Sequence, residues 1–173
     1  MHIPQNLLDG TLCPVTAVFS GLCLAGAALA AYRSAEKPHP LRFAAVSAFL
    51  FAAQMLNFPI SSGTSGHLLG GVLASALLGV PFGVLALALV VTIQALVFAD
   101  GGLTVLGANI FNMAVLGAGL GGLLRLELLK KLPAGGTWSW TATALASWTA
   151  VMLAALACAV ELALTGVLPL EQV

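Results

Sequence analysis

The chain has 173 residues, of which 60% are apolar and only 7% are charged, with six basic and six acidic side chains. A soluble domain carries about 25% charged residues, so this composition excludes an ordinary soluble domain. The zero net charge also excludes a basic face for nucleic acid. We therefore expect an all-α fold, a polytopic membrane bundle of about six transmembrane helices, with residues 1–173 forming a single integral membrane domain.

The amino terminus, Met1-His2, offers three nitrogens to one metal ion: the α-amine of Met1, the deprotonated amide of His2 and the His2 imidazole. Two fused chelate rings would hold these atoms in one plane and leave one position open. An imidazole from elsewhere, such as that of His67, could close it. Four in-plane nitrogens suit Ni(II) or Cu(II) and do not suit Mg(II) or Ca(II). The pattern thus predicts a metal site.

Six apolar segments follow the amino terminus. They cover residues 13–32, 43–58, 68–80, 82–98, 103–124 and 137–167. A spanning helix needs about 20 apolar residues, a length that the first and fifth segments provide. The third segment is short, and the glycines and proline of residues 79–83 separate it from the fourth.

Basic residues test this count of spans because they gather on the cytoplasmic side of membrane proteins. They form two clusters separated by four segments: Arg33, Lys37 and Arg42, then Arg125, Lys130 and Lys131. Four spans place both clusters on one side, which we take as the inner one. The N-terminus, the loop at 59–67 and the turn at Asp100 then share the outer side.

Amides and one carboxylate accompany these segments. Gln54 and Asn57 lie three residues apart, as do Asn109 and Asn112, so each pair shares a helix face. Such amides commonly join helices, or they orient a ligand imidazole through its free ring nitrogen. The candidates for the second role are Asn57, Ser65, Asp100, Asn109 and Asn112. Glu161, near the outer end of the last segment, is expected to reach the interface, and His39 lies on the inner side.

Other chemistry is not indicated. The sequence holds no phosphate-binding G-x-x-x-x-G-K-[ST] loop, so energy for uphill transport must come from a partner. It also shows no nucleophile–base pair, and we do not expect an enzyme. Cys13, Cys23 and Cys158 lack the spacing of a zinc site or a disulfide framework.

Three blocks of sequence resemble the CbiM/NikM family, the substrate-specific (S) membrane components of energy-coupling factor transporters for cobalt and nickel. The blocks are Met1-His2-Ile3-Pro4, the stretch 57–71 with Gly63-Thr64-Ser65-Gly66-His67, and the stretch 98–113 with Asp100-Gly101-Gly102. The resemblance implies nitrogen ligands from Met1, His2 and His67. It implies import of Ni(II) or Co(II) as the transported ligand, with nickel favoured by the Gly-Thr-Ser-Gly-His form, and no cofactor.

The resemblance also implies a setting. Members lie in the cytoplasmic membrane of bacteria or archaea. Their partners are a transmembrane coupling protein and two ATPase subunits that hydrolyse ATP, and some have a small accessory membrane subunit. The chain departs from the family at residues 5–10 and in lacking a further C-terminal helix after residue 167. Two alternatives stay open: an S component for an organic micronutrient, and a non-transporting membrane metal sensor or scaffold.

Overall fold

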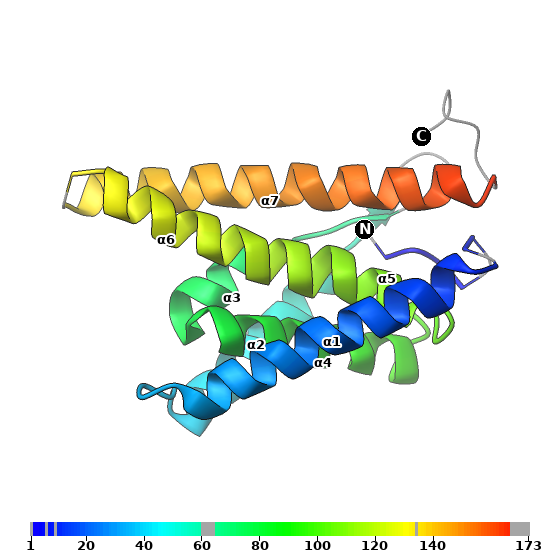
Figure 1. The fold of residues 1–173 in the computed structure, drawn as a ribbon, viewed down its shortest axis with the longest axis horizontal. Helices are drawn as coiled ribbons and strands as arrows, with labels where there is room; N and C mark the ends of the chain where they lie inside the picture. Colours follow the sequence, from blue (N-terminus) through cyan, green and yellow to red (C-terminus); the bar gives the residue numbers. More distant parts are fainter. Residues whose placement is uncertain (1, 6, 9, 60–64, 134, 167–173) are drawn as a thin grey trace.

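The computed structural model describes residues 2–5, 7–8, 10–59, 65–133 and 135–166. Within these residues the regular secondary structure consists of helices and one pair of two-residue strands (Figure 1). The elements are α1 (Leu12–Arg33), α2 (Pro40–Gln54), β1 (Phe58–Pro59), β2 (Ser65–Gly66), α3 (Gly71–Leu78), α4 (Val80–Val97), α5 (Leu106–Ile110), the π-helix η2 (Phe111–Leu120), α6 (Gly121–Lys131) and α7 (Gly136–Leu164).

Four helical stretches in the described chain are long and apolar enough to cross a membrane: α1, α4, the continuous run α5–η2–α6 and α7. Helix α2 is also apolar but has 15 residues. It ends at Gln54 rather than at residue 58, because the residue before Pro59 is driven to extended backbone and Phe58–Pro59 pairs with Ser65–Gly66. The helical class is therefore confirmed, with a small strand pair that hydropathy did not predict.

The third apolar segment differs most from the expectation. Its helix α3 has eight residues, a length of about 12 Å at 1.5 Å per residue, too short to span the hydrocarbon core of about 30 Å. The four residues before it, 67–70, are not helical; extended backbone of that length adds about 13 Å. Residues 67–70 form a non-helical leg. This leg and the short helix α3 together return the chain to the end of the bundle at which α2 begins.

Non-helical backbone is tolerated at membrane depth only where protein surrounds it, and the second half of this leg, Leu69 and Gly70, packs against α2. Gln54 Nε2 donates a 2.8 Å hydrogen bond to the Leu69 carbonyl, and both residues are buried. Gly70 has φ of +72°, and a Cβ there would collide with the Leu50 side chain. At the start of α3, a Cβ on Gly71 would collide with the backbone of Gly117 in η2.

The two ends of the molecule differ in charge. Helix α1 and the run α5–η2–α6 both finish at the end where α1 connects to α2 and α6 to α7 (Figure 1). Both basic clusters therefore lie at one end of the bundle. The N-terminal segment and the end of α7 lie toward the opposite end (Figure 1).

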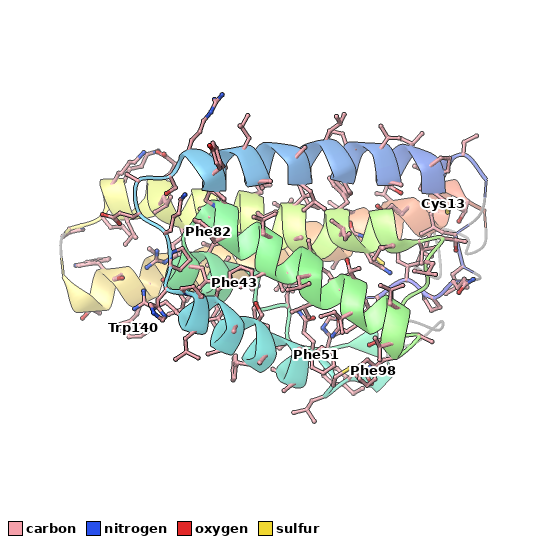
Figure 2. All side chains as sticks on the ribbon, turned by 90° about the horizontal axis from the view of Figure 1, so that it is seen from below. Cys13, Phe43, Phe51, Phe82, Phe98 and Trp140 are labelled. Atoms are coloured by element: carbon pink, nitrogen blue, oxygen red, sulfur yellow. The ribbon has the colours of Figure 1, made fainter. Side chains whose placement is uncertain are left out.

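The core forms around α4, which packs against α1, α2, α3 and η2. Its buried face includes Leu87, Val90 and Val91, which join Leu50 of α2 and Met113 of η2 in one apolar cluster. At the end that carries the N-terminal segment, the rings of Phe51 in α2 and Phe98 after α4 lie 5.2 Å apart between centroids (Figure 2).

Candidate metal centre

The N-terminal segment is held inside the bundle by one amide side chain. Asn109 of α5 accepts a 2.8 Å hydrogen bond from the Ile3 amide and donates a 3.2 Å bond to the Ile3 carbonyl. Both residues are fully buried. This two-way pairing resembles the hydrogen bonds that a residue makes with a neighbouring β-strand. It fixes the backbone of the N-terminal segment at Ile3 and thereby positions His2, the preceding residue.

Two imidazoles meet beside this clamp. The rings of His2 and His67 are stacked, with centroids 4.9 Å apart and planes inclined by 30°. His2 is only 2% exposed. Both His2 nitrogens and Nε2 of His67 are buried without a hydrogen-bond partner among the described residues. Buried polar atoms rarely go unpaired, so three unpaired nitrogens on two adjacent rings indicate a place for a ligand.

The tautomer of His67 follows from its neighbour. Nδ1 of His67 lies 2.9 Å from the carbonyl oxygen of Leu68. A carbonyl can only accept, so Nδ1 carries the proton and Nε2 keeps a free lone pair. This backbone partner thereby fixes the orientation of the ring and leaves Nε2 as the nitrogen able to bind a metal.

The turn after α4 forms another wall of the site. The Gln94 carbonyl accepts hydrogen bonds from the amides of Phe98 and Asp100, each 3.1 Å long, and between them Ala99 adopts φ of +53°. A non-glycine residue rarely takes this conformation, and here it brings Asp100 Oδ2 within 3.5 Å of His2 Nδ1. Gly101, with φ of +84°, lies so close that a Cβ would be 2.7 Å from Asn109 Nδ2.

The site keeps both imidazoles neutral. Burial lowers the pKa of His2 to about 4, against the opposing effect of the Asp100 carboxylate. Burial also lowers the pKa of His67, while its bond to the Leu68 carbonyl opposes that shift. Neutral imidazole is the form that binds metals, so neither ring has to lose a proton at pH 7.

The structure separates the other predicted site residues. Met1 lies outside the described residues, and of Ser65 only the backbone, in β2, is described. Asn57 is exposed beyond the end of α2. Asn109 contacts Ile3 backbone rather than an imidazole. Asn112 donates a 2.7 Å hydrogen bond to Glu161 of α7, so it joins helices.

Two side chains were misjudged from the sequence. Glu161 does not reach the interface, because it is buried, with 6% exposure, against Asn112. Gln94 of α4 was not among the residues predicted for the site. It is fully buried, its side-chain amide has no hydrogen-bond partner among the described residues, and it raises the pKa of His2. Its place in the last turn of α4, six residues before Asp100, was the available signal.

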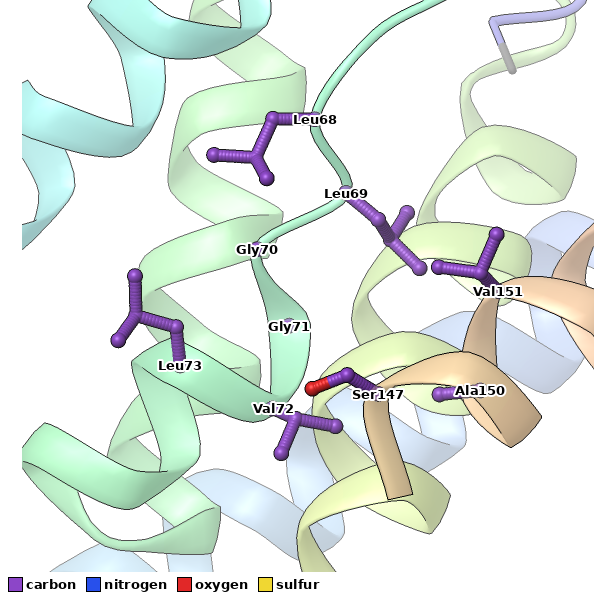
Figure 3. A pocket seen from close by; sticks show the side chains of 9 residues that line it. All are labelled: Leu68, Leu69, Gly70, Gly71, Val72, Leu73, Ser147, Ala150 and Val151. Carbon is purple, nitrogen blue, oxygen red and sulfur yellow. The ribbon is translucent and has the colours of Figure 1, made fainter. Parts of the chain in front are cut away.

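Side chains alone do not complete a metal site. No cluster of three or more His, Cys, Asp or Glu side chains suited to a metal occurs in the part of the chain that the structure describes. A separate hollow of about 130 Å³ lies between the start of α3 and α7 (Figure 3). Leucines, valines and glycines dominate its lining, and Ser147 is its one polar side chain, so it offers no metal ligands.

Comparison with known proteins agrees with these features. A model of the CbiM family, described as the cobalt uptake substrate-specific transmembrane region, matches residues 2–173. A provisionally named fused nickel transport protein, NikMN, from Archaeoglobus fulgidus is 48% identical over 121 residues, which are 70% of this chain and 40% of that protein. The cobalt transport protein CbiM of Thermosediminibacter oceani is 37% identical over 123 residues, 68% of this chain and 49% of that one.

A crystal structure of a transition metal transporter superposes with a TM-score of 0.85 at 36% identity, covering 98% of this chain and 73% of that one. The chain spans about half the length of the curated relatives it matches. These relatives are named as metal transport proteins, not as enzymes. Since the family model covers nearly the whole sequence, the chain belongs to the CbiM family of membrane components for nickel and cobalt transport.

Proposed function

We propose that this protein is the substrate-binding S component of an energy-coupling factor transporter that imports Ni(II) in preference to Co(II). The observation that carries the proposal is the stacked pair His2–His67, with three buried imidazole nitrogens unpaired among the described residues. The ligands would be the Met1 amine, the His2 amide, Nδ1 of His2 and Nε2 of His67. The first three form the two fused chelate rings expected of a free amino terminus followed by histidine.

The donor set supports a planar site. Only two imidazoles are close together, and side chains alone form no cluster of three or more metal ligands in the described chain, so the proposal draws its further nitrogen donors from the backbone of the amino terminus. Four in-plane nitrogens match the geometry of Ni(II) better than the octahedral oxygen ligation of Mg(II) or Ca(II). Burial of His2 would exclude water from this plane.

Two neighbours would orient His2. Asp100 Oδ2 lies 3.5 Å from His2 Nδ1 and adds negative charge next to the cation. The buried Gln94 amide raises the pKa of His2 and has no hydrogen-bond partner among the described residues, so the proposal assigns its oxygen to the His2 ring N–H that the metal leaves free. Outer partners of this kind typically change metal affinity by about 10- to 100-fold.

Transport would need further subunits. The sequence contains no phosphate-binding loop of the Walker type, so the proposal assigns ATP hydrolysis to two ATPase partners and the coupling to a transmembrane partner protein. With residues 1–173 as one membrane domain in a bacterial or archaeal cytoplasmic membrane, the basic end would face inward and the N-terminus outward. The metal would then enter on the outer side.

The amino terminus provides the direct test. We would titrate Ni(II) calorimetrically into purified chain that carries only a C-terminal tag, and into the same chain with one alanine before Met1. The extra residue turns the amine into a peptide nitrogen, and acetylation removes its basicity. Both changes should abolish high-affinity binding while circular dichroism shows an unchanged helical fold.

A matched control separates chemistry from misfolding. A chain made with a removable extension, cut so that Met1 becomes the first residue, should bind weakly before the cut and regain full affinity after it. Equal nickel affinity in the extended and native chains would show that the amine is not a ligand and would overturn the proposed chelate.

A further inference from the structure

A polar hollow opens at the basic end of the bundle. It has a volume of about 310 Å³ and lies between the α1–α2 connection and the junction of α3 with α4, around Leu78 and Gly79. Lys37 and Arg42 line it together with one carboxylate, that of Glu36. The Lys37 ammonium lies over the ring of Tyr32, 5.6 Å from its centroid, which restrains that side chain beside the opening.

An apolar groove lies next to this hollow, with Pro38 in the wall of both. It is lined by Pro38, Pro40 and Phe43 on one side and by Phe82 and Leu85 of α4 on the other. Figure 2 shows Phe43 and Phe82 projecting from neighbouring helices at this end of the molecule, and the groove has a volume of about 360 Å³.

We propose that the hollow and the groove together bind one anionic phospholipid, with the phosphate beside Lys37 and Arg42 and an acyl chain between α2 and α4. Charge complementarity selects the head group, because two cations outnumber the single carboxylate of Glu36. The shared wall at Pro38 selects a molecule that is charged at one end and apolar along its length. This site is at the opposite end from His2 and does not involve the metal ligands.

The position in the bundle fits this occupant. Basic pockets on the inner side of membrane proteins attract anionic head groups. The bound lipid would bridge the α1–α2 connection to the α3–α4 junction. That junction ends the short helix α3, whose opposite end follows the leg bearing His67.

Native mass spectrometry of the purified full chain can test the site. The delipidated protein would be mixed with phosphatidylglycerol or with phosphatidylcholine of the same acyl chains. We expect one phosphatidylglycerol to be retained at several-fold higher occupancy than phosphatidylcholine. The double variant Lys37→Gln with Arg42→Gln should lower phosphatidylglycerol retention about 30-fold, because it removes both cations of the hollow.

Two controls keep the test decisive. Lys130→Gln with Lys131→Gln removes the same charge from exposed positions at the same end, outside the hollow, and should leave retention unchanged. Millimolar glycerol phosphate should not displace the lipid. Equal loss in both double variants, no preference over phosphatidylcholine, or displacement by glycerol phosphate would each overturn the proposal.

Discussion

In His67 the fold commits one ring nitrogen to a hydrogen bond and leaves the other free, whereas neither nitrogen of His2 has a hydrogen-bond partner among the described residues. The Leu68 carbonyl 2.9 Å from His67 Nδ1 commits that atom as a donor, so Nε2 is the nitrogen that can bind a metal. We expect His67→Ala to lower nickel affinity by at least about 100-fold, more than loss of an outer partner would. Calorimetric titration of the variant with Ni(II) measures this effect.

His39 supplies the control for that variant, but not through alanine. Its Nδ1 accepts a 3.2 Å hydrogen bond from the Leu41 amide at the start of α2, and loss of a helix cap typically costs about 1 kcal/mol. His39→Asn keeps a capping side chain and should bind nickel like the parent. Unchanged affinity in His67→Ala would exclude His67 as a ligand.

The number of protons released on nickel binding should reflect the buried state of the two rings. Because burial lowers the pKa of His2 to about 4 and lowers that of His67 below its usual value, both rings are already neutral at pH 7. Only the amine, with a usual pKa of about 7.7–8.0, and the amide then lose protons, about two in total.

Nickel affinity should accordingly fall as pH decreases from 7 to 5 with a slope of about two protons. A lowered pKa means that protons compete for the His2 ring only at more acidic pH, so its contribution appears as pH approaches 4. Calorimetry at pH 7 in buffers with different ionisation enthalpies counts the protons. Release of nearly four would show that both rings are protonated before metal binds.

At the scale of elements, hydropathy predicted the long helices well because span length and apolar composition fix them. Residues 13–32 became α1 (Leu12–Arg33), and 82–98 became α4 (Val80–Val97). It could not predict that residues 67–70 lie outside any helix, because that leg depends on a hydrogen bond from Gln54, 15 residues away, and on the fit of Gly70 against Leu50.

The candidate site was likewise predictable from the sequence only in part. The Met1-His2 start and the motif ending in His67 pointed to the two imidazoles that the structure brings together. The partners of the amides could not be read from spacing, since a shift in helix rotation changes what a side chain meets. Asn109 and Asn112 share a face, yet one contacts Ile3 and the other Glu161.

The contact between η2 and α7 should depend on the buried pair Asn112–Glu161, joined at 2.7 Å. Replacing Glu161 with leucine leaves the Asn112 amide without this acceptor, a loss that typically costs about 1–3 kcal/mol. We expect Glu161→Leu to lower the thermal midpoint in detergent clearly. Glu161→Gln, which retains an acceptor oxygen, should lower it less.

Glu127 offers a comparison for that series. It is exposed and pairs with Lys130 at 2.6 Å on the surface of α6, where ion pairs contribute little. Glu127→Gln should leave the thermal midpoint unchanged. If Glu161→Leu also unfolds like the parent, the buried pair does not stabilise the packing of α7 on η2.

At the scale of the whole molecule, the short helix α3 decides the topology. Leu77, Leu78 and Gly79 at its end lie around the same hollow as Lys37 and Arg42, so the leg and α3 together return the chain to the basic end. With that return, the basic clusters share one end even though four helical stretches alone are long enough to span. The proposed metal centre lies toward the other end, beside the turn after α4.

This arrangement predicts the accessibility of three exposed positions in a chain whose native cysteines have been replaced. Leu103→Cys, in the turn after α4, should react with a membrane-impermeant maleimide in intact cells, because we place that turn on the outer side. Ala35→Cys and Thr137→Cys, in the α1–α2 connection and at the start of α7, should react only after the membrane is permeabilised. Labelling of positions 35 and 137 from opposite sides would mean that α3 and its leg do not count as a crossing. Labelling of both from outside, with position 103 protected, would instead invert the proposed direction of metal entry.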